Sequence, residues 1–330
     1  MSRKSAAMRI IKQYLNLSSS CRGAAVALGN FDGIHIGHQT VVSEIKKIAK
    51  NLKIPSAVMT FDPHPRRFFQ PLAPPLEMTP THVKSRHLKS LGVDIHYVMP
   101  FDKTFASLVA QEFVEKVLVS GLGVRHVAAG YDFVFGKGRK GDVEFLKKSG
   151  EGCGFEVTLV PAVKTDNGKV YSSTVIRKHI VEGRPREAAD SLGRAWEIEG
   201  EVVTGDQRGR QMGFPTANVN AGVSIMPKLG VYAVWAGVPE GKLTKWYRAV
   251  VNVGRRPTFD GEGVTVETHL FNYSGDLYGK VLRVAFIDFI RPELKFDGLD
   301  SIKAQISDDC RAAQEILDDV PFNDITASLK

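Results

Sequence analysis

Short apolar runs alternate with longer amphipathic stretches through the first half of the chain. Runs rich in small and β-branched residues predict strands, and apolar residues repeating every three or four positions predict helices. The expected strands are 24–28, 57–61, 95–99 and 126–129, and the expected helices are 40–50, 83–91 and 110–119. This βαβ order predicts a parallel sheet with helices on both faces and a ligand crevice at the carboxyl ends of the strands.

After residue 188 the pattern changes to short apolar strands separated by glycine and proline turns. The expected strands are 196–203, 231–236, 248–253, 264–271 and 281–287. Such spacing predicts an antiparallel barrel or sandwich. Ile302, Ile306 and Ile316 stand among polar residues in 301–317, so this stretch predicts a helix that packs on the barrel.

The two patterns meet at 184–189, where Gly183 and Pro185 mark the end of a helix. A chain of 330 residues is also long for a single core. We therefore expect two domains, residues 1–186 and residues 187–330.

The composition is that of a folded protein, with 43% hydrophobic and 24% charged residues. Cys21, Cys153 and Cys310 are far apart and form no CxxC pair, which argues against a disulfide framework or a thiolate metal site and favours the cytoplasm. No apolar run reaches the roughly 18 residues that a membrane-spanning helix needs. We expect no membrane partner.

The net charge of +8 is unevenly distributed, because residues 1–190 hold 28 basic and 17 acidic residues and the remainder is slightly acidic. Such a field suits nucleic acid or small polyphosphate ligands. The first 31 residues are basic and contain no acidic residue, as in a transit peptide, but the first expected core strand already begins at Ala24.

The segment 29–38, GNFDGIHIGH, directly follows the first expected strand and opens the first helix. A helix N-terminus offers unpaired N–H groups and a positive dipole end, which favour phosphate. His35 and His38 add donors there, and Gly37 between them lets a nucleotide approach the backbone. A tight structural turn, or a metal site of Asp32, His35 and His38, are the alternatives.

Further along, 172–177 reads SSTVIR, with hydroxyls at a helix start and Arg177 one turn in. Phosphates suit this arrangement, although serine and threonine are also ordinary N-caps. The aromatic and basic loops 60–66 and 130–142 would suit a planar ring and its phosphate, but Phe61 and Phe133 could equally be core residues.

The second half contains a glycine-spaced loop at 205–218, GDQRGRQMGFPTAN, which lacks the GK[ST] ending of a Walker motif. Thr216 and Asn218 carry oxygen ligands suited to Mg²⁺, or else bond their own backbone in a turn. Downstream, Glu267 is a carboxylate within an apolar strand. Alternation places Thr265, Glu267 and His269 on one face, so a solvated, outward-facing Glu267 is the competing picture.

In this order, from about Ala24 to Leu317, these segments resemble the bifunctional riboflavin kinase and FMN adenylyltransferase family. The resemblance implies a Rossmann-like nucleotidyltransferase domain followed by a barrel kinase domain, with riboflavin, FMN and ATP as substrates and Mg²⁺ as cofactor. His35, His38 and Glu267 would be catalytic, with Glu267 as general base, and Thr216 and Asn218 would hold the metal. The implied nucleotide-binding residues are Asn30, Phe31, Asp32, Gly37, Ser172, Ser173, Thr174, Arg177, Gly205, Gly209, Arg210 and Gly213. The implied flavin-binding residues are Phe61, Pro63, Asp132, Phe133 and Arg291.

Two other hypotheses stand beside the bifunctional enzyme. In one, only the kinase is active and the first domain binds a nucleotide without turning it over. In the other, the basic first half is an RNA-binding or regulatory module, whose binding would fall steeply with salt. The acidic second half and the lack of interleaved basic and aromatic motifs argue against nucleic acid as a partner.

Overall fold

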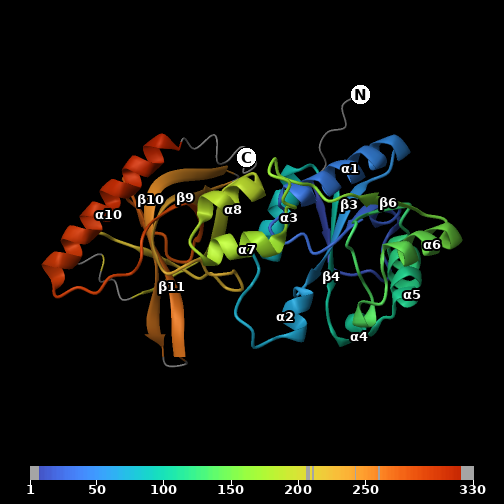
Figure 1. The fold of residues 1–330 in the computed structure, drawn as a ribbon, viewed down its shortest axis with the longest axis horizontal. Coiled ribbons are helices and arrows are strands. Elements are labelled where there is room, and N and C mark those ends of the chain that lie inside the picture. Colours follow the sequence, from blue (N-terminus) through green and yellow to red (C-terminus); the bar gives the residue numbers. More distant parts are fainter. Residues whose placement is uncertain (1–6, 206–208, 210–211, 242, 259–260, 321–330) are drawn as a thin grey trace. The chain divides into compact units, whose positions relative to one another are not determined.

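The computed structural model describes residues 7–205, 209, 212–241, 243–258 and 261–320 (Figure 1). The chain divides into two compact units. The first contains residues 1–74 and 79–172, and the second contains residues 75–78 and 173–330. The boundary predicted at residue 186 stays a prediction. Helix α7 (Ser173–Val181) lies before that residue and helix α8 (Pro185–Leu192) contains it, but both belong to the second unit.

The first unit is built on a six-stranded sheet with the order β1-β4-β3-β2-β5-β6, in which every neighbouring pair is parallel. Its strands are β1 Arg9–Ile11, β2 Ala25–Leu28, β3 Ser56–Asp62, β4 Ile95–Pro100, β5 His126–Gly130 and β6 Glu156–Val160. Its helices are η1 Ser19–Cys21, α1 Ile36–Leu52, α2 Pro65–Phe69, α3 Thr81–Ser90, α4 Lys103–Ser107, α5 Ala110–Glu112, η2 Phe113–Leu122, η3 Lys137–Arg139 and α6 Val143–Cys153. The predicted parallel α/β sheet is confirmed.

Each face of this sheet carries its own hydrophobic cluster, because alternate residues of a strand point to opposite sides. Val26 and Leu28 of β2 join the cluster with η2, whereas Ala25 and Ala27 join the cluster with α1. Helices therefore cover both faces, as expected. The predicted helix 110–119 forms as the short α5 followed by the π-helical η2.

One polar bridge crosses this core. The imidazole of His96 on β4 lies 2.8 Å from the hydroxyls of both Thr60 on β3 and Ser85 on α3. Burial, with the charge of Lys84 adding to it, lowers the pKa of His96 to about 3. A neutral ring therefore joins the two strands to the helix at ordinary pH.

The second unit is a closed barrel with the strand order β10-β11-β8-β7-β12-β9 and antiparallel pairing throughout. Its strands are β7 Trp196–Val203, β8 Ala217–Val219, β9 Gly230–Glu240, β10 Leu243–Thr258, β11 Gly261–Leu270 and β12 Val281–Arg291. Its helices are α7 Ser173–Val181, α8 Pro185–Leu192 and α10 Leu299–Asp319. The barrel prediction is confirmed, and the short β8 is the strand that the sequence pattern missed.

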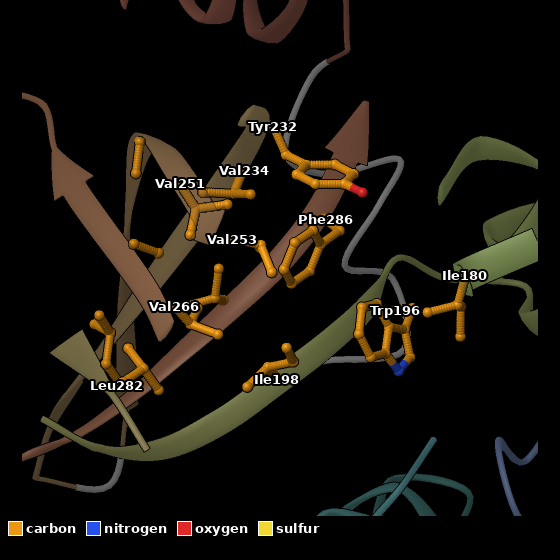
Figure 2. Close-up of a cluster of buried hydrophobic side chains, with 14 of the residues drawn as sticks. Ile180, Trp196, Ile198, Tyr232, Val234, Val251, Val253, Val266, Leu282 and Phe286 are labelled. Carbon is orange, nitrogen blue, oxygen red and sulfur yellow. The ribbon is translucent and has the colours of Figure 1, made fainter. Parts of the chain in front are cut away.

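Figure 2 shows the barrel interior, where Ile198 of β7, Val251 and Val253 of β10, Val266 of β11 and Phe286 of β12 point toward one another. The outer face of β9, β10 and β12 carries a second apolar cluster, completed by Ala313 and Leu317 of α10. The predicted C-terminal helix therefore packs on the outside of the barrel.

Candidate functional sites

The segment 29–38, called the HxGH turn after His35 to His38, joins β2 to the start of α1 at the carboxyl edge of the parallel sheet. Phe31, Gly33 and Ile34 all have positive φ, at 48°, 87° and 43°. Only glycine adopts this region without strain, and buried Phe31 and Ile34 side chains hold the other two residues in it. The core thus dictates the path of a strained turn, as is common at ligand-binding loops.

His35 and His38 are brought together by this turn. His35 caps α1, and its Nδ1 accepts a hydrogen bond of 3.3 Å from the backbone N–H of His38. Their rings are stacked, with centroids 3.6 Å apart, and the His38 ring also contacts Phe31. Because Nδ1 of His35 accepts, the neutral ring carries its proton on Nε2. The pair adds directional donors to the positive end of the helix.

Asp32 is buried, and Thr79 donates to its Oδ1 through both the backbone N–H, at 3.0 Å, and the hydroxyl, at 3.2 Å. The Thr79 hydroxyl in turn accepts from Gly33 N–H at 2.8 Å. Thr79 therefore holds the turn, and sequence reasoning missed it because it lies 47 residues away. The sequence offered one sign of such a residue, because a carboxylate in a tight turn needs a hydrogen-bonding partner once it is buried. Asn30 is exposed beside it.

Gly37 lies against the His35 ring. A Cβ added at Gly37 would meet Cε1 and Nδ1 of His35 at 3.2 Å and the Cβ of Tyr171 at 3.6 Å. The missing side chain therefore makes room for the stacked imidazole. This is a reason for glycine in addition to the close approach of a nucleotide.

On the adenylyltransferase activity that the resemblance implies, we expect Gly37→Ala to slow FAD formation from FMN by about tenfold, because displacing the His35 ring by a few tenths of an ångström misaligns its donors. The melting temperature should change little, since the better helix propensity of alanine offsets the crowding. FAD formation from FMN and thermal unfolding measure the two effects. A wild-type rate would show that the ring position is not critical.

Three segments meet at this edge of the sheet, because β3 and β5 are the two neighbours of β2. The segment 60–66 contains the end of β3 and the start of α2, the HxGH turn follows β2, and the segment 130–142 begins at the last residue of β5. The topology therefore juxtaposes the nucleotide and flavin segments that the sequence had singled out.

The aromatic residues of these loops are partly buried. Phe61 packs edge-on against Phe101 at 5.7 Å, and Phe133 stacks on Phe135 at 5.6 Å. Both belong to the rim of the hydrophobic core, whereas Pro63 and Asp132 are exposed. Packing against the core is therefore one reason for a phenylalanine at each of the two positions. The flavin role of Phe61, Pro63, Asp132 and Phe133 stays a prediction.

The SSTVIR segment starts α7 as expected, with Ser173 as its first residue and Arg177 one turn in. Nε of Arg177 donates to the carbonyl of Leu76 at 3.0 Å. Ser172 falls in the first unit, and Ser173, Thr174 and Arg177 fall in the second. Their phosphate contacts stay predictions.

In the second unit, strand pairing brings the predicted metal ligands beside the predicted base. Glu267 on β11 is the register partner of Asn218 on β8, and Thr268 is that of Ala217. Cross-strand partners point to the same face, and so do residues two apart. Asn218 and Glu267 therefore share one face of the sheet, and Thr216 directly precedes β8.

That face borders a cavity of about 310 Å³. The lining residues come from the strands, the glycine loop, the segment 292–298 and α10. They are Gly209, Met212, Phe214, Thr216, Val231, Val250, Asn252, Glu267, His269, Arg291, Glu293, Leu294, Phe296, Ile302, Ile306 and Asp309. Glu267 points away from the barrel interior, as alternation predicted, but it is half-buried in a covered cavity rather than on a free surface.

The glycine loop folds tightly over Thr216. Phe214 N–H donates to the Gly209 carbonyl at 2.8 Å, and a Cβ at Gly209 would lie 3.3 Å from the Thr216 hydroxyl. A Cβ at Gly205 would lie 2.3 Å from the Asn218 amide. A side chain at Gly205 would therefore collide with Asn218, and Gly213 has φ of 90°. Asn218 is not among the residues that line the cavity. Arg210, predicted to bind nucleotide, lies outside the described residues.

His269 is a residue of this site to which the sequence assigned no role. Its Nδ1 lies 2.8 Å from the Pro215 carbonyl, and its ring meets Phe214 and Phe271 edge-on at 5.7 Å each. It joins the strand of Glu267 to the turn of Thr216. Alternation had already placed His269 on the face of Glu267.

Arg291, predicted to contact flavin, also lines the cavity, but it forms two hydrogen bonds of 2.7 Å with the carboxylate of Asp309.

Among the described residues, no helix has the length and apolarity to cross a membrane. Among the same residues, no three or more His, Cys, Asp or Glu side chains form a group that could hold a metal ion.

Comparison with known proteins adds an independent line. Residues 17–174 match the FAD synthetase family, and residues 192–317 match the riboflavin kinase family. A bifunctional riboflavin kinase/FMN adenylyltransferase of Haemophilus influenzae is 36% identical, covering 93% of this chain and 98% of its own length. Its counterpart in Escherichia coli K12 is 38% identical, covering 93% and 97%. This chain belongs to the bifunctional riboflavin kinase/FMN adenylyltransferase family.

The family's two-domain architecture also matches a solved structure. A protein of Streptococcus pneumoniae described as a macrolide-efflux protein is 35% identical, with a TM-score of 0.80 over 94% of this chain and 99% of its own. Residues 175–191 lie between the two family matches.

Proposed function

We propose that this chain makes FAD from riboflavin in two steps, phosphorylating riboflavin to FMN with one ATP and adenylylating FMN with a second. The observation that carries the proposal is the presence of both family matches on one chain, each over a unit with its own candidate site. The relatives support the bifunctional enzyme over the kinase-only alternative.

Riboflavin phosphorylation takes place in the barrel unit. The terminal hydroxyl of the ribityl chain attacks the γ-phosphorus of ATP, its proton passes to the Glu267 carboxylate, and ADP leaves. Support comes from the half-buried Glu267, which lines the cavity together with Thr216. General base catalysis of this kind contributes about 10² to 10⁴ in rate.

Thr216 and Asn218 would hold Mg²⁺. Their hydroxyl and amide oxygens are hard, neutral donors, which suit a cation shared with phosphate oxygens. The cavity that Thr216 and Glu267 both line gives such a group room beside the Thr216 side chain. When bound, the cation neutralises charge on the transferred phosphoryl group.

FMN adenylylation takes place at the HxGH edge of the first unit. A phosphate oxygen of FMN attacks the α-phosphorus of ATP in line, and pyrophosphate leaves. His35, His38 and the N-terminus of α1 stabilise the charge that develops, and neither histidine becomes a nucleophile. Support comes from the stacked imidazoles at the helix start and from the loops that the topology places beside them.

Its partners are small molecules, namely riboflavin, FMN and ATP, and it works in the cytoplasm without nucleic acid. The basic first unit then serves polyphosphate ligands. The assigned functional domains remain residues 1–186 for the adenylyltransferase and 187–330 for the kinase.

Isotope labelling tests the whole sequence of reactions. With riboflavin and γ-³²P-ATP, label should appear in FMN and then in FAD. With α-³²P-ATP, label should appear in FAD and never in FMN, because the adenylyl group enters only in the second step. Label from γ-³²P-ATP in FMN without any FAD would establish the kinase-only alternative.

A further inference from the structure

The segment 291–309, called the excursion below, leaves the barrel at Arg291, the last residue of β12, and ends at Asp309 in α10. Nε and Nη2 of Arg291 bond Oδ1 and Oδ2 of Asp309, each at 2.7 Å, across a sequence separation of 18 residues. A fork of two parallel charge-assisted bonds fixes direction as well as distance. This ion pair of Arg291 and Asp309, called the clasp below, therefore joins the two ends of the excursion.

The excursion supplies one wall of the cavity that contains Glu267. Its apolar lining residues are Leu294, Phe296, Ile302 and Ile306. Positions 302, 306 and 309 are four and three residues apart, so both isoleucines lie on the helix face that carries Asp309. The clasp thus sets the distance between this apolar wall and the strands opposite.

The clasp is buried at Asp309 and half-buried at Arg291, and further bonds support it. Asp309 is 5% exposed, and Gln305 Nε2 also donates to its Oδ1 at 3.0 Å. Nη1 of Arg291 donates to the Pro292 carbonyl at 2.9 Å, and the guanidinium lies 5.9 Å from the Phe296 ring. A buried ion pair stabilises a fold little better than apolar residues of the same size. Its advantage here is a fixed geometry at the edge of the cavity.

We propose that Arg291 and Asp309 are positioning residues of the riboflavin kinase site, holding the excursion wall at the width of the planar flavin ring. This proposal rests on the proposed kinase function. Two donors of the Arg291 fork are already bound to Asp309, so Arg291 acts on the flavin through the wall. Direct flavin binding by Arg291 stays a prediction.

The test is steady-state kinetics of FMN formation for Asp309→Asn, Arg291→Lys and the double variant. Asparagine turns an NH₂ group toward the guanidinium, and lysine replaces the fork with one point charge. We expect each single change to raise the KM for riboflavin about tenfold, with kcat and the KM for ATP within about twofold. The double variant should be no worse than about tenfold, because both changes break one interaction.

Asp308→Asn is the matched control. Asp308 is the neighbouring residue on α10, exposed and paired with Arg311 at 3.2 Å. Its loss should leave the KM for riboflavin unchanged. FMN-to-FAD conversion, which belongs to the first unit, should stay at the wild-type rate in every variant.

Four results would overturn the proposal. They are a raised KM in Arg291→Lys but not in Asp309→Asn, single effects that multiply in the double variant, a fall in kcat with KM unchanged, and no effect at all. If Asp309→Asn abolishes kinase turnover by unfolding, Asp309→Glu keeps the charge but shifts the carboxylate, and it must raise KM with kcat retained. Failure of the proposed function looks different, because the wild-type chain would then make no FMN.

Discussion

Replacing Glu267 by glutamine is expected to lower FMN formation from riboflavin and ATP by about 10² to 10⁴, because the amide cannot accept the ribityl proton. The change is nearly isosteric, so the barrel should keep its fold. FMN-to-FAD conversion should continue at the wild-type rate, since it uses the other unit. Chromatographic separation of riboflavin, FMN and FAD measures both reactions in one sample.

Glu201→Gln is a suitable control for this experiment. Glu201 is an exposed carboxylate on β7 of the same barrel and is not among the residues that line the cavity. It should support FMN formation at the wild-type rate. Undiminished FMN formation by Glu267→Gln would exclude Glu267 as the base.

The double change His35→Ala and His38→Ala should produce the reverse pattern. Removing two preorganised donors from the charge-stabilising site should lower FAD formation from FMN by at least about 100-fold. FMN formation from riboflavin should be unaffected. The same chromatographic assay, started once from riboflavin and once from FMN, separates the two steps.

A matching thermal unfolding curve is the control for the double variant, because the Nδ1 of His35 also caps α1. Losing a cap typically costs about 1 kcal/mol, which leaves a domain folded. Retention of FAD formation in a folded double variant would show that the imidazoles are not part of the transfer site.

The architecture of both units was predictable from local pattern, because buried strands such as β2 and β3 read as continuous apolar runs and α10 shows clear periodicity. The missed strands have weaker patterns. β1 and β8 are only three residues long, and β6 begins with an exposed glutamate. Pairing with neighbours, rather than composition, makes these segments strands.

The candidate site was predictable only in its motif residues. Alternation correctly placed Glu267 on the outward face of β11, but no local pattern could indicate that α10 and the segment 292–298 cover that face. Thr79, His269 and Asp309 act through partners 47, 54 and 18 residues away. Such contacts depend on the tertiary fold, which a single sequence does not reveal.

Mixing two variants tests the central claim of separate sites most directly. Glu267→Gln alone should give almost no FAD from riboflavin, and the His35 and His38 double-alanine chain alone should accumulate FMN with very little FAD. An equimolar mixture supplied with riboflavin, ATP and Mg²⁺ should form FAD, because one chain makes the FMN that the other adenylylates. A mixture in which FMN accumulates without FAD, or in which no FMN forms, would contradict two independent active sites on this chain.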